Sequence, residues 1–178
     1  MATTNTLYPH TINAYHVYLD GDTNLLGIAS VDLGEIAFKT GDLYGAGISG
    51  TMEVPILGQT NSIKLTLNWN VFHNSSIVSL KNTGSELVLR IAQQGLNLED
   101  HKIGITPVKI TATVMPTSFN LGSLEQGAAS GSSTVFEVVS LLYEVDGSSR
   151  IDINKPGNKF EIDGEDQMAD INAAIGIS

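Results

Sequence analysis

The segment Leu33–Leu57, LGEIAFKTGDLYGAGISGTMEVPIL, decides how the rest of this sequence is read. It leaves one strand-like segment, runs through glycine-rich sequence that is too long for a hairpin turn, and returns past Pro55 towards another strand. Long glycine-punctuated excursions from a β-rich body either close over a binding site or reach another subunit. The function therefore depends on which of these two roles the segment has.

The segments on either side of this stretch have the period-2 pattern of β-strands. Gly27–Lys39 alternates between apolar and polar residues, but the pattern slips by one at Gly34, which predicts a β-bulge that redirects the strand. Ser62–Phe72 alternates without a break, so one face of the predicted strand is apolar. The predicted inward residues are Ile63, Leu65, Leu67, Trp69 and Val71.

The remaining sequence predicts further strands, two short helices and one loop. The other strands are expected at Ile12–Asp20, Glu86–Gln93, Pro107–Met115, Thr134–Val145, Arg150–Asn154 and Phe160–Ile162, with Thr134–Val145 central because both its faces are apolar. A helix is expected over Ser76–Asn82, capped by Asn74 or Ser75, with Ile77 and Leu80 inward and Gly84 just past its end. A second helix is expected over Glu165–Ile175, capped by Asp163 and stopped at Gly176.

These elements predict one domain over residues 1–178, because the chain is long enough for one substantial core. The expected fold class is α+β and mostly β. Roughly seven or eight strands form an antiparallel β-sandwich or barrel, with one or two short helices and a long Gly-rich arm at 33–57. Leu121–Ser133, which is rich in Gly, Ser and Ala, is predicted to be a flexible surface loop.

Composition and charge exclude several functional classes. The formal net charge is −10, divided as −5 over residues 1–60, +2 over 61–120 and −7 over 121–178. Such a surface repels nucleic acid, whose binding depends on Lys and Arg contacts to phosphate. The sequence contains no cysteine, and no apolar run approaches the length of a membrane span or signal peptide. Synthesis in a cytoplasm and no membrane anchor are expected.

Two sequence motifs suggest a cofactor or a metal site, but the residues around each motif do not fit such a site. Gly45–Gly50 matches GxGxxG, but a strand-like segment follows it where dinucleotide binding needs a helix. Asp20–Asn24 opens like a calcium loop, but Leu25 and Val31 stand where a glycine and a bidentate acid are required. The four histidines lack ligand spacing, and no catalytic signature occurs. No cofactor, metal site or enzymatic activity is predicted.

The order of elements resembles the major tail tube protein of contractile-tailed bacteriophages and R-type bacteriocins. The N-terminal part of the resemblance is INAYHVYLDGDTNLLGIASVDLGEIAFKTGDLYGAGISGTMEVPILG followed by SIKLTLNWNVF. The C-terminal part is a long strand that ends in Tyr-Glu-Val-Asp-Gly, then IDINKPGNKFEIDG and a tail that closes in Ile-Gly-Ile-Ser. Residues 84–132 match least.

The resemblance implies a structural subunit without enzymatic activity. Six copies form a ring, and rings stack into the hollow inner tube of a contractile tail, which penetrates the target envelope and in a phage conducts DNA. Implied partners are further copies of the chain, the tail sheath, baseplate and tail terminator proteins; DNA passes without specific binding. The location is a virion tail or bacteriocin particle, assembled in the bacterial host cytoplasm.

Within this picture Leu33–Leu57 is the arm by which one copy holds the next. Glycines allow close packing, and apolar residues anchor the contact. The candidate contact residues are Leu43, Tyr44, Gly45, Gly47, Ile48, Gly50, Met52 and Val54. An acidic lumen is also expected, because like charge keeps DNA off the wall.

The alternative class is a β-sandwich module that binds carbohydrate or calcium. Exposed aromatic side chains on one face would favour it, but only 6% of residues are aromatic and the single Trp69 lies on the apolar side of its predicted strand. The sequence leaves open whether the tube belongs to a phage, a DNA-free bacteriocin or a secretion-type injection machine.

Overall fold

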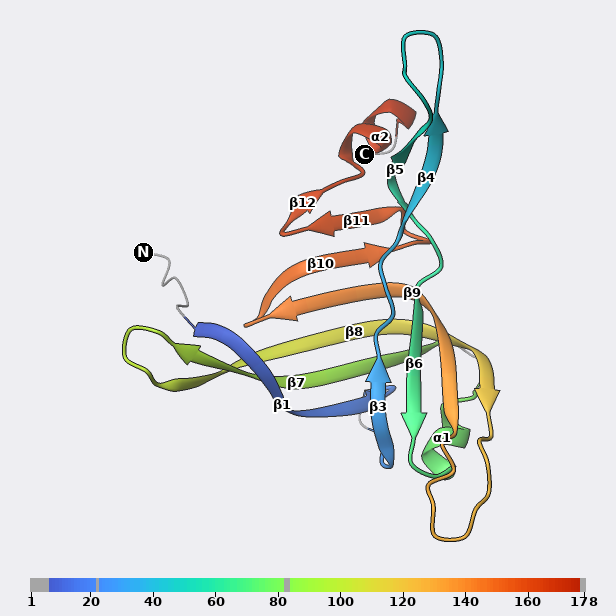
Figure 1. Cartoon of the computed structure of the whole chain (residues 1–178), viewed down its shortest axis with the longest axis vertical. Coiled ribbons are helices and arrows are strands. Elements are labelled where there is room, and N and C mark those ends of the chain that lie inside the picture. Colours follow the sequence, from blue (N-terminus) through green and yellow to red (C-terminus); the bar gives the residue numbers. More distant parts are fainter. Residues whose placement is uncertain (1–6, 22, 82–83, 177–178) are drawn as a thin grey trace.

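The computed structural model describes residues 7–21, 23–81 and 84–176, which form twelve strands and two short helices. The strands are β1 (Leu7–Leu19), β2 (Thr23–Asn24), β3 (Ile28–Asp32), β4 (Phe38–Leu43), β5 (Met52–Thr60), β6 (Lys64–Trp69), β7 (Ser85–Asn97), β8 (Ile103–Asn120), β9 (Ser133–Val145), β10 (Ser148–Asn154), β11 (Lys159–Ile162) and β12 (Glu165–Asp166). The helices are α1 (Asn74–Val78) and α2 (Ala169–Ile175). The predicted class, mostly β with two helices, is confirmed (Figure 1).

The body is one antiparallel sheet that folds over itself at β9. The main path runs β12-β11-β10-β9-β8-β7-β1-β2, and β6 pairs with both β9 and β3. The first half of β9 pairs with β6, from Asn68↔Ser133 to Lys64↔Glu137, and the second half pairs with β10 from Ser140 onward. Register shifts in the β8–β9 ladder bend both strands near this change of partner. As Figure 1 shows, β3 and β6 therefore cross in front of β1, β7 and β8.

The hydrophobic core lies between these two crossing layers. Alternate residues of β6 and β8 point into it, as their period-2 pattern predicts. Trp69 is buried, and its indole N–H donates to Thr134 Oγ1 at 3.0 Å, so the polar edge of the ring is satisfied inside the core. The cluster comprises Val17, Leu19, Leu25, Ile63, Leu65, Leu67, Trp69, Leu87, Leu89, Ile110, Ala112, Val114, Phe136, Val138, Ile153, Phe160 and Met168.

The prediction of one bulged strand over Gly27–Lys39 is wrong. β3 ends at Asp32, residues 33–37 have no ladder partner, and β4 begins a separate two-stranded sheet with β5. Gly34 has φ +66, and a Cβ there would lie 2.0 Å from the Lys64 carbonyl oxygen. The glycine therefore permits a backbone crossing rather than a bulge. The bulge of β3 lies instead between Ile28 and Ser30.

The first predicted helix and its preceding strand differ from the structure at several points. α1 runs over Asn74–Val78, so it begins and ends earlier than the predicted Ser76–Asn82. β6 ends at Trp69, so Val71 lies beyond the ladder and is exposed. The cap of α1 is His73, whose side chain accepts from the Ser75 N–H, while Ser76 bonds back to His73. Ile77 is exposed and Leu80 is half-buried after the helix; Asn82, the predicted helix end, lies outside the described residues.

The predicted C-terminal helix begins later than expected. Asp163 lies in a turn before β12, and α2 starts at Ala169 after Met168, without a side-chain cap. Its stop at Gly176 is confirmed, because that residue has the left-handed conformation, φ +74. Ile175, in the last turn, is exposed.

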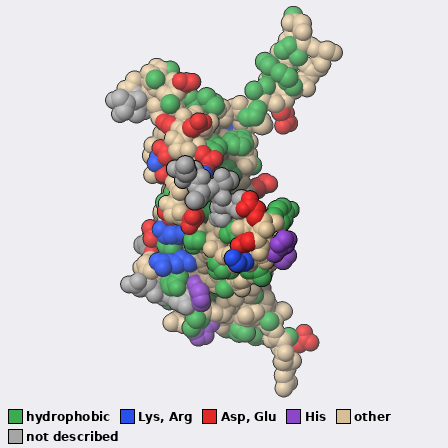
Figure 2. Space-filling view, turned by 90° about the vertical axis from the view of Figure 1, so that its left-hand side faces the viewer, with side chains coloured by type: hydrophobic (Ala, Val, Ile, Leu, Met, Phe, Trp, Pro, Cys, Tyr) green, Lys and Arg blue, Asp and Glu red, His purple; other side chains and the backbone are tan. Residues whose placement is uncertain are grey.

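The glycine- and serine-rich loop over residues 121–132 projects from the end of the body opposite to the arm (Figures 1 and 2). Its base is tied to the end of β6, since Ser130 N–H donates to Asn70 O and Trp69 N–H donates to Ser132 O, each at 2.8 Å. Ser130 and Ser132 are buried. The predicted last residue, Ser133, belongs to β9.

Candidate functional site: a protruding hairpin arm

The most distinctive feature of the surface is the β4–β5 hairpin, called the arm below. It is a two-stranded sheet of its own, and it projects from the top of the body with hydrophobic side chains along its length (Figures 1 and 2). The ladder pairs Leu43 with Met52, Asp42 with Glu53 and Gly41 with Val54. An isolated two-stranded hairpin is only marginally stable in water, so such a structure is typical of an element that is completed by a partner.

The ladder register divides the arm into two unlike faces. Because directly paired residues share a face, Leu43, Met52 and Val54 form an apolar face, on which they are 42%, 51% and 38% exposed. The opposite face carries Asp42 and Glu53 side by side. Neither carboxylate has an ion-pair partner among the described residues, and like charges directly opposite each other destabilise a strand pair.

All eight predicted contact residues lie on this arm. Tyr44 is 74% exposed at the end of β4, and Ile48 is exposed in the tip. Gly47 and Gly50 have positive φ, so they shape the tip, and a Cβ on any of the three glycines would meet nothing within 4 Å. The structure brings the predicted residues together, and their role in contacting another subunit stays a prediction. The acidic pair was not among them, because its proximity depends on the register.

The root of the arm is held firmly to the body. Asn61, just after β5, donates its backbone N–H to Ala37 O at 2.8 Å and its side-chain amide to Phe38 O at 3.4 Å. The Phe38 ring lies 5.9 Å from that of Phe160 on β11. Gly58, with φ +68, lies against Met168, where a Cβ would approach the sulfur to 1.7 Å. The arm is thus packed on β11 and on the start of α2.

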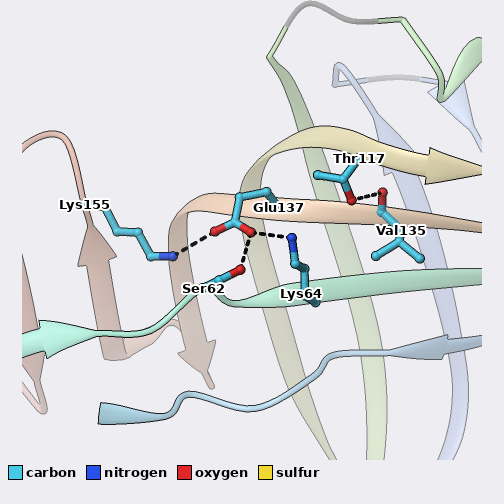
Figure 3. Close-up of polar contacts among 6 residues, drawn as sticks. All are labelled: Ser62, Lys64, Thr117, Val135, Glu137 and Lys155. Atoms are coloured by element: carbon cyan, nitrogen blue, oxygen red, sulfur yellow. Dashed lines mark hydrogen bonds and ion pairs between the residues drawn. The ribbon is translucent and has the colours of Figure 1, made fainter. Parts of the chain in front are cut away.

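A polar cluster around Glu137 fixes the strand that follows the arm. Figure 3 shows the Glu137 carboxylate between Ser62, Lys64 and Lys155. Ser62 Oγ donates at 2.5 Å, and the Lys64 and Lys155 ammonium groups lie at 2.9 and 3.2 Å. Partial burial raises the pKa of Glu137, but these hydrogen bonds and charges outweigh burial and lower the pKa to about 2.

This cluster lies where β9 exchanges β6 for β10 as its partner. Lys64 pairs with Glu137 in the β6–β9 ladder, and Lys155 directly follows β10. A nearby hydrogen bond joins β8 to β9: the Thr117 hydroxyl donates to Val135 O at 3.1 Å (Figure 3). Glu137 therefore links β6 to the end of β10 through its two lysine partners, and it holds in place the segment that follows the arm. The sequence carries no signal for this cluster, because Ser62, Lys64 and Lys155 all lie far from Glu137 along the chain.

The residues of the weaker motifs have structural roles. Gly45–Gly50 forms the arm tip and is followed by β5, as the rejection of the dinucleotide motif predicts. Asp20 accepts the Glu86 N–H at 3.0 Å and so joins the end of β1 to β7; Asp22 lies outside the described residues. Over the described residues, no group of three or more His, Asp or Glu side chains is placed to hold a metal ion. Neither described helix is long and apolar enough to cross a membrane.

Comparison with solved structures shows which known structures share this fold. The sheath/tube terminator of the PVC extracellular contractile injection system is similar with a TM-score of 0.51 and 18% identity, over 77% of this chain and 97% of that one. A chain of the PVC sheath-tube complex gives 0.52 and 17%, over 77% and 92%. The anti-feeding prophage tube terminating cap gives 0.52 and 18%, over 81% and 99%. The fold is that of tube-type subunits of contractile injection machines.

The sequence family agrees with the fold. Residues 9–176 match the family model described as phage tail tube protein FII, so nearly the whole chain is covered. The chain belongs to this family, and its role is that of a structural component of a tail tube rather than an enzyme. No curated protein matches the chain. The predicted resemblance is therefore confirmed.

Proposed function

We propose that this chain self-assembles into hexameric rings that stack as the hollow inner tube of a contractile tail, and that the arm holds adjacent copies together. The single observation that carries the proposal is the apolar face of the arm. Leu43, Met52 and Val54 lie on a hairpin that projects from the body, where they remain exposed to water. Covering such side chains with a second copy is favourable by about 25 cal/mol per Å² of apolar surface.

Free sheet edges provide a second basis for assembly. β1 pairs with β7 on one side, but on the other side it pairs with β2 only at Tyr18 and Leu19. β3 pairs with β6 on one side, and the described residues supply no strand for its other edge. Exposed edges of this kind pair with other chains unless they are covered, so in a ring the neighbouring copies can occupy them.

In this proposal the tube lies inside a sheath and ends at baseplate and terminator proteins. The solved structures of similar fold include a sheath-tube complex and tube terminators, which supports these partners. Assembly takes place in the bacterial host cytoplasm, and the product is a virion tail or a bacteriocin-type particle. In a phage, DNA passes through the lumen without specific binding, because a chain of net charge −10 repels phosphate.

The positions that a binding module would use have structural roles in this chain. Trp69 is 1% exposed and bonded to Thr134, so it offers no surface for sugar stacking. Asp20 accepts two contacts from the start of β7, namely Glu86 N–H and the Ser85 hydroxyl. These residues stabilise the chain itself.

The proposal is tested by removing the apolar face of the arm. The triple variant Leu43→Ser, Met52→Ser, Val54→Ser should fold like the wild type, judged by circular dichroism and thermal unfolding, because these side chains lie outside the core. Negative-stain microscopy and sedimentation should show rings or tubes for the wild type and monomers for the variant. Deletion of Asp42–Val54 should act in the same way.

A matched control is Leu124→Ser, which removes an apolar side chain that is 84% exposed in the loop at the other end of the molecule. We expect this variant to assemble. A wild type that remains monomeric under all assembly conditions contradicts the proposal. Unfolding of the body on deletion of Asp42–Val54 contradicts the assignment of the arm.

A further inference from the structure

The acidic face of the arm points to a second contact, distinct from the apolar one. Asp42 and Glu53 are cross-strand neighbours without an ion pair, on a hairpin whose other face is apolar. The arm has one cation, Lys39, which lies at the register shift near the root and forms no ion pair with either carboxylate. Two adjacent carboxylates repel each other, so a cation from outside the arm stabilises this arrangement.

The body offers few cations that could serve. Six of the nine Lys and Arg residues are already paired with carboxylates: Lys64, Lys102, Lys109, Arg150, Lys155 and Lys159. Among the described residues, Lys39, Lys81 and Arg90 have no ion pair. Lys39 belongs to the arm, so the unpaired cations of the body are Lys81 and Arg90.

Arg90 lines a surface groove, and Lys81 does not. It is exposed on β7 in a groove of about 480 Å³ that crosses β1, β7 and β8, with Ala14, Ala92 and Pro107 also in its lining. Its guanidinium lies 5.5 Å from the centre of the Tyr18 ring, which holds the side chain in place. The other cation of the groove, Lys109, is paired with Glu144 at 3.0 Å. Arg90 therefore presents an uncompensated positive charge in an apolar recess.

The chemistry of the two surfaces is complementary. A guanidinium carries five N–H donors in a planar fork and can serve two carboxylates at once, whereas an ammonium is a point charge. Beside the acidic pair, the same arm face carries Thr40 and Pro55, which suit a recess lined by Ala and Pro side chains. Both surfaces belong to this chain, so a second copy supplies what each one lacks.

We infer that Asp42 and Glu53 of one copy bind Arg90 of a second copy, with the acidic face of the arm lying in the groove. This inference rests on the proposed self-assembly and names a receiving surface for the arm. The apolar face remains free for the contact proposed above, so an arm with two unlike faces is held between two surfaces of neighbouring copies.

Charge reversal tests the inference. Arg90→Glu should lower the yield of tubes at least tenfold, and so should Asp42→Arg combined with Glu53→Arg. Combining all three changes in one chain exchanges the charges and should restore assembly. Lys81→Glu is the matched control, because it makes the same change of charge at the other unpaired cation of the body, and it should assemble like the wild type.

A crosslink provides a readout that does not depend on long tubes. The sequence has no cysteine, so Thr40→Cys with Ala92→Cys introduces one thiol on the acidic face of the arm and one beside Arg90. Mild oxidation should give disulfide-linked oligomers, whereas Thr40→Cys with Lys81→Cys should not. Restoration by the charge exchange and a specific crosslink support the inference. Wild-type assembly together with unaffected Arg90→Glu tubes overturns it and leaves the proposed function intact, whereas a monomeric wild type overturns both.

Discussion

Replacing Glu137 by Gln should destabilise the body in a way that depends on pH. The native pKa of Glu137 is lowered from 4.5 to about 2, a difference of roughly 2.5 units, and each unit corresponds to 1.36 kcal/mol. This gives an upper value of about 3 kcal/mol. Because the side chain is 29% exposed, solvent screening reduces the expected loss to about 1–2 kcal/mol at pH 7.

The pH dependence follows from the direction of the shift. A carboxyl group whose pKa is lower in the folded state stabilises that state fully above the unfolded value of 4.5. This contribution is lost as the pH falls towards about 2, where the folded protein also takes up the proton. The difference in unfolding free energy between wild type and Glu137→Gln should therefore be constant from pH 7 to 5 and should shrink at lower pH.

The assay is urea unfolding of the monomeric triple arm variant, with and without Glu137→Gln, at several pH values. Using the arm variant keeps assembly from adding to the measured stability. The control is Asp163→Asn, which removes one pair to Arg150 whose two side chains are 62% and 51% exposed, and which should cost less than about 0.5 kcal/mol. A difference for Glu137→Gln below that value, or one that is unchanged down to pH 3, refutes the reasoning.

Two further predictions concern the backbone and the core. Gly34→Ala should cost more than about 2 kcal/mol or prevent folding, because its Cβ would overlap the Lys64 carbonyl, whereas Gly45→Ala should leave the thermal midpoint unchanged; equal midpoints for the two variants would contradict the crossing. Trp69→Phe should cost about 2–3 kcal/mol in urea unfolding, because it leaves a small void and removes the donor to Thr134; a loss below about 0.5 kcal/mol would show that this hydrogen bond contributes little.

The sequence predicted those parts of the fold that depend on local pattern. The alternation in β6 and β8 correctly placed residues such as Leu67 and Ile110 in the core, and the two-sided apolar character of β9 correctly made it central. The family resemblance rested on the order of such elements, so it survived errors at their ends.

The errors arose where a distant contact decides the local structure. The strand ends before Gly34 because the Lys64 backbone crosses the chain there. His73, rather than Asn74 or Ser75, caps α1, because it forms reciprocal hydrogen bonds with Ser76 and its neighbour. The arm was predicted as a segment, but its two faces follow from the β4–β5 register, which includes a shift near the root. The pairing of Asp42 with Glu53 required that register.

The long pairing of β1 with β7 has a consequence for the order of folding during synthesis. β1 pairs from Leu7↔Asn97 to Leu19↔Leu87, so the ribosome must make most of β7 before β1 has its partner. The β4–β5 ladder joins residues that are close in sequence, so it can form before the β1–β7 ladder, although its packing on Phe160 and Met168 comes only with the end of the chain. The groove is completed later than the arm sequence, since Arg90 and β8 are synthesised after β5. On the inferred contact, a chain still on the ribosome can offer its arm to a finished copy before it has a groove of its own to receive one.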